Sequence, residues 1–175
     1  MQKRVLFHAP VISGTNAMKY SYPYHSPVGT LHITQTGEFV TGLSFHPAPD
    51  ARCRETALIR ETARQLEAYF NGSRTTFDIP LRPEGTPFQQ KIWGLLQKIP
   101  YGQTITYKQL ATLAGNSKAC RAAGMANNQN PVMIVIPCHR VIGSDGSLTG
   151  YAGGLPVKQQ LLQLEQMYCS SRLRL

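Results

Sequence analysis

The alternation of apolar and polar residues predicts a β-hairpin in the first quarter of the chain. Leu31 and Ile33 alternate with polar neighbours, residues 36–38 favour a turn, and a second apolar segment covers residues 40–45. A repeat of two residues is typical of a strand that buries one face. Residues 30–45 are therefore expected to form two antiparallel strands.

A helix and a proline-rich segment follow the predicted hairpin. Residues 55–70 repeat apolar side chains at helical spacing, and Gly72 is suited to end that helix. Residues 77–87 contain three prolines and one glycine, a composition typical of a connecting segment. We therefore expect a small α/β domain over residues 1–76, built from an antiparallel sheet and a helix, and a linker over residues 77–87.

The second half of the chain has mostly helical periodicity. One apolar face extends over residues 88–99, and Thr106 begins a capping box with Gln109 at the start of a short helix. Residues 116–117 are expected to supply a tight turn and the N-cap of a second short helix over residues 118–127. Two short helices joined by a glycine-containing turn are typical of a helix-turn-helix.

The second helix of this motif carries little bulk and one long central cation, Arg121. Its small residues are Ala119, Ala122, Ala123, Gly124 and Ala126. A slim helix favours close approach to a nucleic-acid groove, although small residues also allow tight packing inside a core. The predicted fold class is α/β, in which the N-terminal α/β domain precedes a mostly helical domain, residues 88–175, with a winged-helix-like helix-turn-helix.

Charge is unevenly distributed along the 175 residues, whose formal net charge is +9. Residues 1–87 carry nine Lys or Arg against seven Asp or Glu, whereas residues 88–175 carry nine against only Asp145 and Glu165. Such asymmetry favours a polyanionic partner for the second half, although a merely soluble basic surface would have the same composition.

The composition argues against several other classes of protein. No apolar stretch reaches the ~18 residues that a membrane helix needs, and the first residues make a poor signal peptide. The four cysteines form no disulfide framework, and no C-x-x-C or H-x-x-x-H pair predicts a zinc site. We expect a cytoplasmic protein, associated with the nucleoid if bacterial, that needs no metal or cofactor.

A candidate nucleophile follows the apolar run Val132–Ile136, which is predicted to be a buried strand. Pro137, Cys138, His139 and Arg140 stand where this strand should end. Attack on carbon needs the thiolate, and a reference pKa of about 8.5 leaves only a few per cent of a thiol ionised at neutral pH. His139, acting through a water molecule, is a candidate base. Arg140 is expected to brace the backbone or to lower the pKa of the thiol.

The last helix, predicted over residues 156–168, supplies a candidate partner for the imidazole. Glu165 falls within the apolar arc of this helix, so its carboxylate is expected to be partly buried and to need a partner. One interpretation is a relay from the thiol through water and imidazole to Glu165. The other is a structural ion pair of Glu165 with Lys158 or Arg140. Lys158 lies near the helix start, so its side chain is expected to reach water.

Several uncommon motifs occur in one order between residues 86 and 165. They are Thr86-Pro87-Phe88-Gln89, Trp93, Ile99-Pro100-Tyr101-Gly102, Tyr107, Arg121-Ala122-Ala123-Gly124, Asn130-Pro131, Pro137-Cys138-His139-Arg140-Val141-Ile142-Gly143 and Gly150-Tyr151-Ala152-Gly153-Gly154. Together they resemble the O6-alkylguanine-DNA alkyltransferase family, the methylated-DNA–protein-cysteine methyltransferases. The first half resembles this family more weakly, through Ser26-Pro27-Val28-Gly29 before a strand.

The resemblance implies a repair reaction on double-stranded DNA. A monomeric protein, able to bind DNA cooperatively, would hold the minor groove and rotate an O6-alkylguanine, and also an O4-alkylthymine, out of the duplex. Arg121 would fill the space left in the duplex, and Tyr107 would crowd the phosphate and place its hydroxyl on a ring nitrogen of the base. The alkyl group would pass to Cys138. Nothing in the sequence predicts a group that cleaves the resulting thioether, so each molecule is expected to react once.

The same resemblance implies roles for further residues. The catalytic residues are expected to be Cys138, His139, Glu165, Asn130 and Tyr107, with Asn130 bracing the turn before the thiol. The DNA contacts are expected to be Arg121, Tyr107, Thr106, Lys118, Ala119, Ala122 and Gly124. The substrate pocket is expected to include Asn127, Val141, Tyr151, Ala152 and Gly153. The carbonyls of Cys138 and Val141 would accept from the exocyclic amine of guanine, and a backbone N–H near Ala152 would face O6.

This chain departs from the family pattern at three positions. Ala152 stands where some members have serine, Met133 where some have proline, and Cys120 where alanine is frequent. Two other functions remain as alternatives. A non-enzymatic sensor of alkylated DNA would lack the acceptor cysteine, and a cysteine hydrolase would leave the helix-turn-helix and Arg121 unexplained.

Overall fold

The computed structural model describes residues 17–172, with side chains as far as Ser170, and divides the chain into two compact units. These units are Met1–Glu84 and Gly85–Leu175. The residues judged to be a poor signal peptide lie outside the described part of the chain. Each unit is described by itself below.

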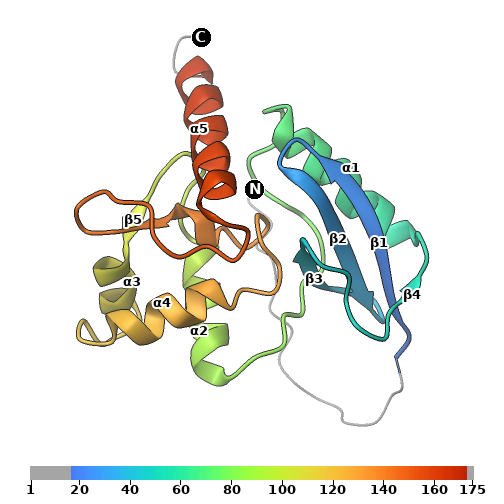
Figure 1. Cartoon of the computed structure of the whole chain (residues 1–175), viewed down its shortest axis with the longest axis horizontal. Coiled ribbons are helices and arrows are strands. Elements are labelled where there is room, and N and C mark those ends of the chain that lie inside the picture. Colours follow the sequence, from blue (N-terminus) through green and yellow to red (C-terminus); the bar gives the residue numbers. More distant parts are fainter. Residues whose placement is uncertain (1–16, 173–175) are drawn as a thin grey trace. The chain divides into compact units, whose positions relative to one another are not determined.

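The first unit is a four-stranded sheet with one helix. Its elements are β1 (Lys19–Ser26), β2 (Gly29–Thr36), β3 (Phe39–Ser44), β4 (Arg52–Cys53) and α1 (Ala57–Phe70). The strand order is β3-β2-β1-β4, with antiparallel pairing from β1 to β3 and parallel pairing of β4 with β1. Figure 1 shows α1 lying along one face of this sheet. The predicted hairpin is confirmed as β2 and β3.

No element was predicted from the sequence for the residues of strand β1, which include Pro23. Proline cannot donate to a neighbouring strand and is therefore tolerated mainly at sheet edges. In the structure β4 pairs only with Tyr20 and Ser21, so Pro23 lies where β1 has just one neighbour, β2. The missing N–H of Pro23 therefore removes no hydrogen bond between β1 and β4.

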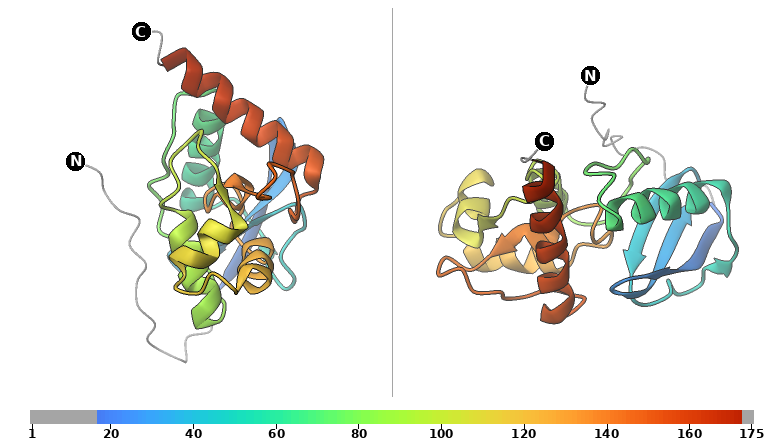
Figure 2. Two further views of the ribbon diagram at one scale, coloured as in Figure 1. Left: turned by 90° about the vertical axis from the view of Figure 1, so that its left-hand side faces the viewer. Right: turned by 90° about the horizontal axis from the view of Figure 1, so that it is seen from above.

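Helix α1 is set by its caps and by one apolar face. The Thr56 side chain accepts a hydrogen bond from the Ile59 N–H, and Gly72, at a φ of +77°, reverses the chain after the last turn. Ile59, Leu66 and Tyr69 are fully or almost fully buried. The right-hand view of Figure 2, from above, shows α1 crossing one face of the strands.

The first part of the predicted linker belongs to the first unit. Ile79 and Leu81 are buried, and Leu81 forms a parallel bridge with Val40 of β3. The Val40 N–H donates to Pro80, and the Arg82 N–H donates back to Val40. The apolar residues between the prolines thus add a short paired segment to the edge of the sheet at β3. The high proline content of this segment had indicated only a linker. The unit boundary lies between Glu84 and Gly85.

The second unit consists mainly of helices around a small apolar core. Its elements are α2 (Pro87–Leu96), β5 (Ile105–Thr106), α3 (Tyr107–Leu113), α4 (Cys120–Asn128), the 3-10 turn η1 (Cys138–Arg140), β6 (Val141–Ile142) and α5 (Leu155–Arg172). Strands β5 and β6 pair in parallel. Trp93 is buried, and its indole N–H donates to the Ala126 carbonyl at 2.9 Å, which ties α2 to α4. The predicted fold class, a sheet-containing domain before a mostly helical one, is confirmed.

Helices α3 and α4 form the predicted helix-turn-helix. The capping box of Thr106 and Gln109 is present, and Gly115 ends α3 at a φ of +93°. The predicted N-cap of the second helix is wrong, since α4 begins at Cys120 and its N-cap, Ala119, makes no side-chain cap. The Asn116 side chain instead accepts from the Lys118 N–H within the turn.

None of the helices within residues 17–172 combines the length and the apolar character that crossing a bilayer requires.

Candidate functional site

The apolar run before Cys138 is a buried tight turn, so the predicted strand is wrong. The Ile136 N–H donates to Val132 at 3.0 Å and the Val135 N–H to Met133 at 2.8 Å. Ile134 has a φ of +71°, which is an uncommon conformation for a β-branched residue. All five residues from 132 to 136 are buried. The reversal delivers the chain directly into η1, whose first residue is Cys138.

Asn130 holds this turn closed and also contacts the sulfur. Its Nδ2 donates to the Ile136 carbonyl at 2.7 Å and to Cys138 Sγ at 3.0 Å. Its Oδ1 accepts from the Val132 N–H at 3.0 Å. Because Asn130 comes two residues after α4, one buried side chain connects the end of α4 to the thiol.

Cys138 is 3% exposed, and its surroundings keep the thiol protonated. Burial raises the pKa of Cys138 to about 11, although the Asn130 hydrogen bond and the charge of Lys158 act to lower it. Of the two roles expected for Arg140, the contact with the backbone is present, since Nη1 donates to the Ile99 carbonyl, whereas its charge is not among the causes that shift the pKa of the thiol. Reaction at this sulfur therefore needs a base that removes the proton.

A buried cluster of His139, Arg140 and Glu165 lies beside the thiol segment. His139 Nε2 and Glu165 Oε1 are 2.8 Å apart. Arg140 donates to both carboxylate oxygens, from Nη2 to Oε1 at 2.8 Å and from Nε to Oε2 at 2.9 Å, and its Nη1 donates to the Ile99 carbonyl at 2.7 Å. The Gly102 N–H donates to Oε2 at 2.9 Å. Glu165 thus has both partners between which the sequence left the choice open, the imidazole and Arg140.

The cluster fixes which nitrogen of His139 carries the proton. Burial alone would raise the pKa of Glu165, but hydrogen bonds and charge from His139 and Arg140 outweigh it and lower that pKa, so the carboxylate is ionised. An ionised carboxylate only accepts, so His139 Nε2 must donate to it. Burial lowers the pKa of His139, although the Glu165 hydrogen bond opposes this, and the imidazole is neutral. Nδ1 is therefore an acceptor, and it has no hydrogen-bond partner among the described residues.

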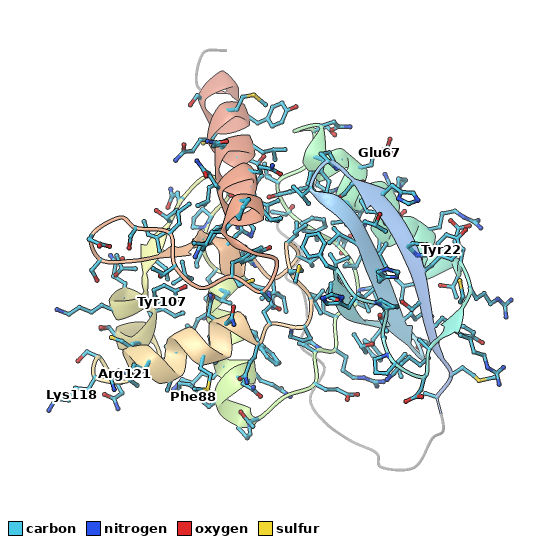
Figure 3. All side chains as sticks on the ribbon, viewed as in Figure 1. Tyr22, Glu67, Phe88, Tyr107, Lys118 and Arg121 are labelled. Atoms are coloured by element: carbon cyan, nitrogen blue, oxygen red, sulfur yellow. The ribbon has the colours of Figure 1, made fainter. Side chains whose placement is uncertain are left out.

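Tyr107 connects the helix-turn-helix to the loop of residues 143–154. Its hydroxyl is 2.9 Å from the Thr149 carbonyl and 3.2 Å from the Gly150 carbonyl. A Cβ at Gly124 of α4 would lie 3.4 Å from the Tyr107 ring, which is an ordinary van der Waals contact, so the ring packs directly against this part of α4. Figure 3 shows Tyr107 between the start of α3 and the loop. Burial is the main cause that raises its pKa.

Lys158 is fully buried, contrary to the expectation that it reaches water. Its Nζ donates to the Val141 carbonyl at 2.6 Å and to the Thr149 carbonyl at 2.7 Å. Burial lowers the pKa of Lys158 to about 8. The amine finds these two carbonyls because the loop folds back over the start of α5, and Tyr107 and Lys158 thereby share the Thr149 oxygen.

Three of the expected pocket residues are buried near the thiol, and two of these leave polar atoms unpaired. Asn127 is 0% exposed, and its Nδ2 donates to the Cys138 carbonyl at 3.3 Å. Asn127 Oδ1 and the Tyr151 hydroxyl are buried without a hydrogen-bond partner among the described residues. Val141 is also buried, whereas Ala152 is exposed and Gly153 partly so. Burial and the charges of Cys138 and Glu165 raise the pKa of Tyr151 well above its usual value.

The residues expected to contact DNA fall into exposed and packed groups. Lys118, Arg121 and Ala122 are exposed, and Figure 3 shows Lys118 and Arg121 projecting from the helix-turn-helix. Ala119 and Gly124 are half-buried. The Thr106 hydroxyl is used to cap α3. Ala123 and Ala126 are buried. The small residues of α4 are therefore compatible with both alternatives, core packing and close approach to a nucleic acid. One side of the helix packs inward, and the other side is exposed and carries Arg121.

Sequence reasoning missed the positioning role of Lys158. The signal was present, since Lys158 lies in the same apolar arc of the last helix as Glu165. The buried contact of Asn130 with Sγ was likewise invisible, because it depends on the tight turn.

Two family models match nearly the whole described chain. The model described as 6-O-methylguanine DNA methyltransferase, DNA binding domain, matches residues 87–167. The model described as 6-O-methylguanine DNA methyltransferase, ribonuclease-like domain, matches residues 18–83.

Individual relatives resemble the chain over most of its length. The methylated-DNA–protein-cysteine methyltransferase of Methanosarcina acetivorans is 47% identical over 148 residues, which are 81% of this chain and 95% of the relative. That of Haemophilus influenzae is 46% identical over 158 residues, 86% of this chain and 88% of the relative. The crystal structure of Mycobacterium tuberculosis OGT in complex with DNA matches with a TM-score of 0.80 and 40% identity, covering 85% of this chain and 94% of that chain.

Proposed function

Because this chain belongs to the O6-methylguanine DNA methyltransferase family, we propose that it repairs DNA by moving an alkyl group from O6 of guanine to its own Cys138. The observation that carries the proposal is that the buried Cys138 thiol is followed directly in η1 by His139, a buried neutral imidazole whose Nδ1 is an acceptor with no hydrogen-bond partner among the described residues. The motif resemblance in the sequence is thus confirmed at the level of the family.

The proton of the thiol has a route to the carboxylate cluster. A water molecule that joins Sγ–H to His139 Nδ1 would pass the proton to the imidazole, and Glu165 would stabilise the imidazolium through Nε2. The sulfur then attacks the alkyl carbon, and the carbon–O6 bond breaks with its electron pair on oxygen. The leaving guanine anion takes up the proton that His139 accepted, which returns the imidazole to its neutral form. The Asn130 N–H, at 3.0 Å, stabilises charge that develops on sulfur.

The product is a thioether, which water does not hydrolyse under ordinary conditions. We therefore propose that each molecule reacts once. O4-alkylthymine is proposed as a second substrate, because its alkyl carbon is likewise bonded to an exocyclic oxygen.

Base eversion is proposed because the sulfur is too deeply buried to reach a stacked base. Cys138 is 3% exposed, so a guanine inside the duplex cannot present its O6 to Sγ. The exposed Arg121 near the start of α4 supports a role in filling the space that the base leaves. Lys118 supports a phosphate contact. We propose that the protein acts on DNA as a monomer.

The proposal is tested by the mass of the intact protein after incubation with a duplex that contains O6-methylguanine. We expect a gain of one methylene mass, located on the Cys138 peptide, with no further gain after a second dose of substrate. Cys138→Ala should bind the duplex but show no gain. A wild-type protein that binds methylated DNA and stays unmodified would identify a damage sensor instead.

A further inference from the structure

The side-chain amide of Asn127 uses a donor within the protein and leaves its acceptor unused. Nδ2 donates to the Cys138 carbonyl at 3.3 Å, and a hydrogen-bonding interaction of the same side chain acts to lower the pKa of Tyr107. The geometry of this side chain therefore has Nδ2 turned toward a protein carbonyl and Oδ1 without a hydrogen-bond partner among the described residues. An unpaired carbonyl oxygen in a side chain that is 0% exposed is unusual and indicates a ligand-binding position.

The two backbone carbonyls expected to recognise guanine already accept hydrogen bonds from this chain. The Cys138 carbonyl accepts from the Val141 N–H and from Asn127 Nδ2, which uses both of its lone pairs. The Val141 carbonyl accepts from Lys158 Nζ at 2.6 Å. The Val141 carbonyl keeps one lone pair for a donor on the bound base, and Asn127 Oδ1 is a second acceptor, which no described residue occupies.

O6-alkylguanine and O4-alkylthymine differ at one atom of the edge that such a pocket reads. Next to the alkylated oxygen both bases present an unprotonated ring nitrogen, which is an acceptor. The following position is an amine donor in guanine and a carbonyl acceptor in thymine. A protein acceptor placed there favours guanine and opposes thymine, because two facing acceptors leave both unpaired.

We propose that Asn127 Oδ1 accepts a hydrogen bond from the exocyclic amine of the everted alkylguanine, and that Asn127 thereby sets the preference of this protein for guanine over thymine. This inference rests on the proposed function. His139 Nδ1, another unpaired buried acceptor, is assigned to the thiol proton. Asn127 Oδ1 belongs to a side chain that already contacts the Cys138 carbonyl, so it is the unpaired side-chain acceptor that we assign to the amine.

The test deletes one hydrogen-bonding group from the protein and the matching group from the substrate. Single-turnover rate constants are measured with matched duplexes that contain O6-methylguanine, O6-methylhypoxanthine, which lacks only the exocyclic amine, or O4-methylthymine. The protein is wild type, Asn127→Leu, or Asn128→Leu, which makes the same change at an exposed amide one residue later on α4. Asn127→Leu also removes the bond to the Cys138 carbonyl, so the ratio between substrates, not the absolute rate, is the measured quantity.

We expect wild type and Asn128→Leu to react about tenfold faster with O6-methylguanine than with O6-methylhypoxanthine, since one hydrogen bond contributes roughly this factor. In Asn127→Leu this ratio should fall toward one, and the preference for guanine over thymine should fall with it. A wild-type protein that does not distinguish guanine from hypoxanthine overturns the proposal whether or not any variant folds. Equal losses on all three substrates in Asn127→Leu also overturn it, because they indicate a purely structural residue. Absence of transfer from every duplex by wild type would instead refute the proposed function.

Discussion

The Cys138 thiol is subject to opposing influences on its pKa. Burial favours the neutral form, while the Asn130 hydrogen bond and the Lys158 charge favour the thiolate, and burial prevails with a pKa of about 11. Before the reaction, the thiol of Cys138 and the imidazole of His139 are therefore both uncharged. Ionisation therefore belongs to the reaction itself, when an alkyl carbon is in place and the imidazole can take the proton.

The thiol pKa leads to a testable pH dependence. Because burial raises the pKa of Cys138 to about 11, the thiolate fraction grows about tenfold per pH unit until about pH 11, so reaction with iodoacetamide should still be rising at pH 10. We expect the Cys138 peptide to be alkylated with a midpoint near pH 11. Peptide-resolved mass spectrometry over a pH series measures this midpoint, and the exposed Cys53 peptide shows that the reagent is active. A Cys138 midpoint below pH 9 would contradict the site described.

At the residue scale, the sequence revealed charged groups more readily than their contacts. Glu165 was identified because a carboxylate inside an apolar arc needs a partner. Lys158 gave the same signal, but its length suggested access to water, and only the fold of the loop shows the two carbonyls that bind it. The unused acceptor of Asn127 depends on where Tyr107 and the Cys138 carbonyl lie, which no local pattern encodes.

At the element scale, hydrogen bonds from two helices to the Thr149 carbonyl oxygen hold the loop of residues 143–154. Tyr107 from α3 and Lys158 from α5 both donate to the Thr149 carbonyl, and Lys158 also bonds to Val141 of β6. The DNA-binding motif, the loop and the last helix thus meet at a single peptide group. Movement of any one of them has to break or replace a hydrogen bond to this carbonyl.

Removal of the amine should release this loop. Lys158→Met keeps much of the side-chain volume but leaves the Val141 and Thr149 carbonyls without their charged donor, which we expect to cost about 1–3 kcal/mol of unfolding free energy. Amide hydrogen exchange in residues 143–154 should accelerate, and alkyl transfer should slow. Gln159→Met, at the exposed next position, is the control and should change neither. Unchanged exchange in Lys158→Met would show that the loop is held by other contacts.

Elements whose apolar residues repeat at a regular spacing could be predicted from the sequence, but the turn before Cys138 could not. The hairpin, α1 and the capping box of α3 follow from apolar spacing and cap residues. Residues 132–136 contain no glycine, proline or asparagine to indicate a reversal, so their apolar character suggested a strand. Their turn is imposed from outside by Asn130, which bonds to both ends of the run.

At the scale of the whole molecule, the charge that can meet DNA is smaller than the sequence count suggests. Residues 88–175 hold nine Lys or Arg, but Arg140 and Lys158 are buried. In the described part of this half the exposed cations are Lys91, Lys98, Lys108, Lys118 and Arg121, and the remaining two, Arg172 and Arg174, have no described side chains. The composition correctly indicated a negatively charged partner, but only the structure distinguishes the exposed cations from Arg140 and Lys158, which are buried.

This limit gives a quantitative expectation for binding. With at most seven available cations, the slope of log Kobs against log salt concentration should be no steeper than about −6, since each phosphate contact contributes about −0.9. Lys118→Ala should reduce the slope by about one. Arg60→Ala, in the first unit and paired with Glu55, should leave it unchanged. Fluorescence anisotropy of a labelled duplex over a salt series measures all three, and a steeper slope would require contacts from residues 1–87.

The seclusion of the sulfur also determines how long an unused molecule keeps its capacity. Because the proposed reaction exhausts each molecule, any stray oxidant or electrophile that modified Cys138 would remove a repair event. A protonated thiol that is 3% exposed reacts slowly with dissolved reagents, which compete with lesions only when they can enter the site. The burial that makes the thiol a weak nucleophile at rest therefore preserves a reserve of functional protein between lesions.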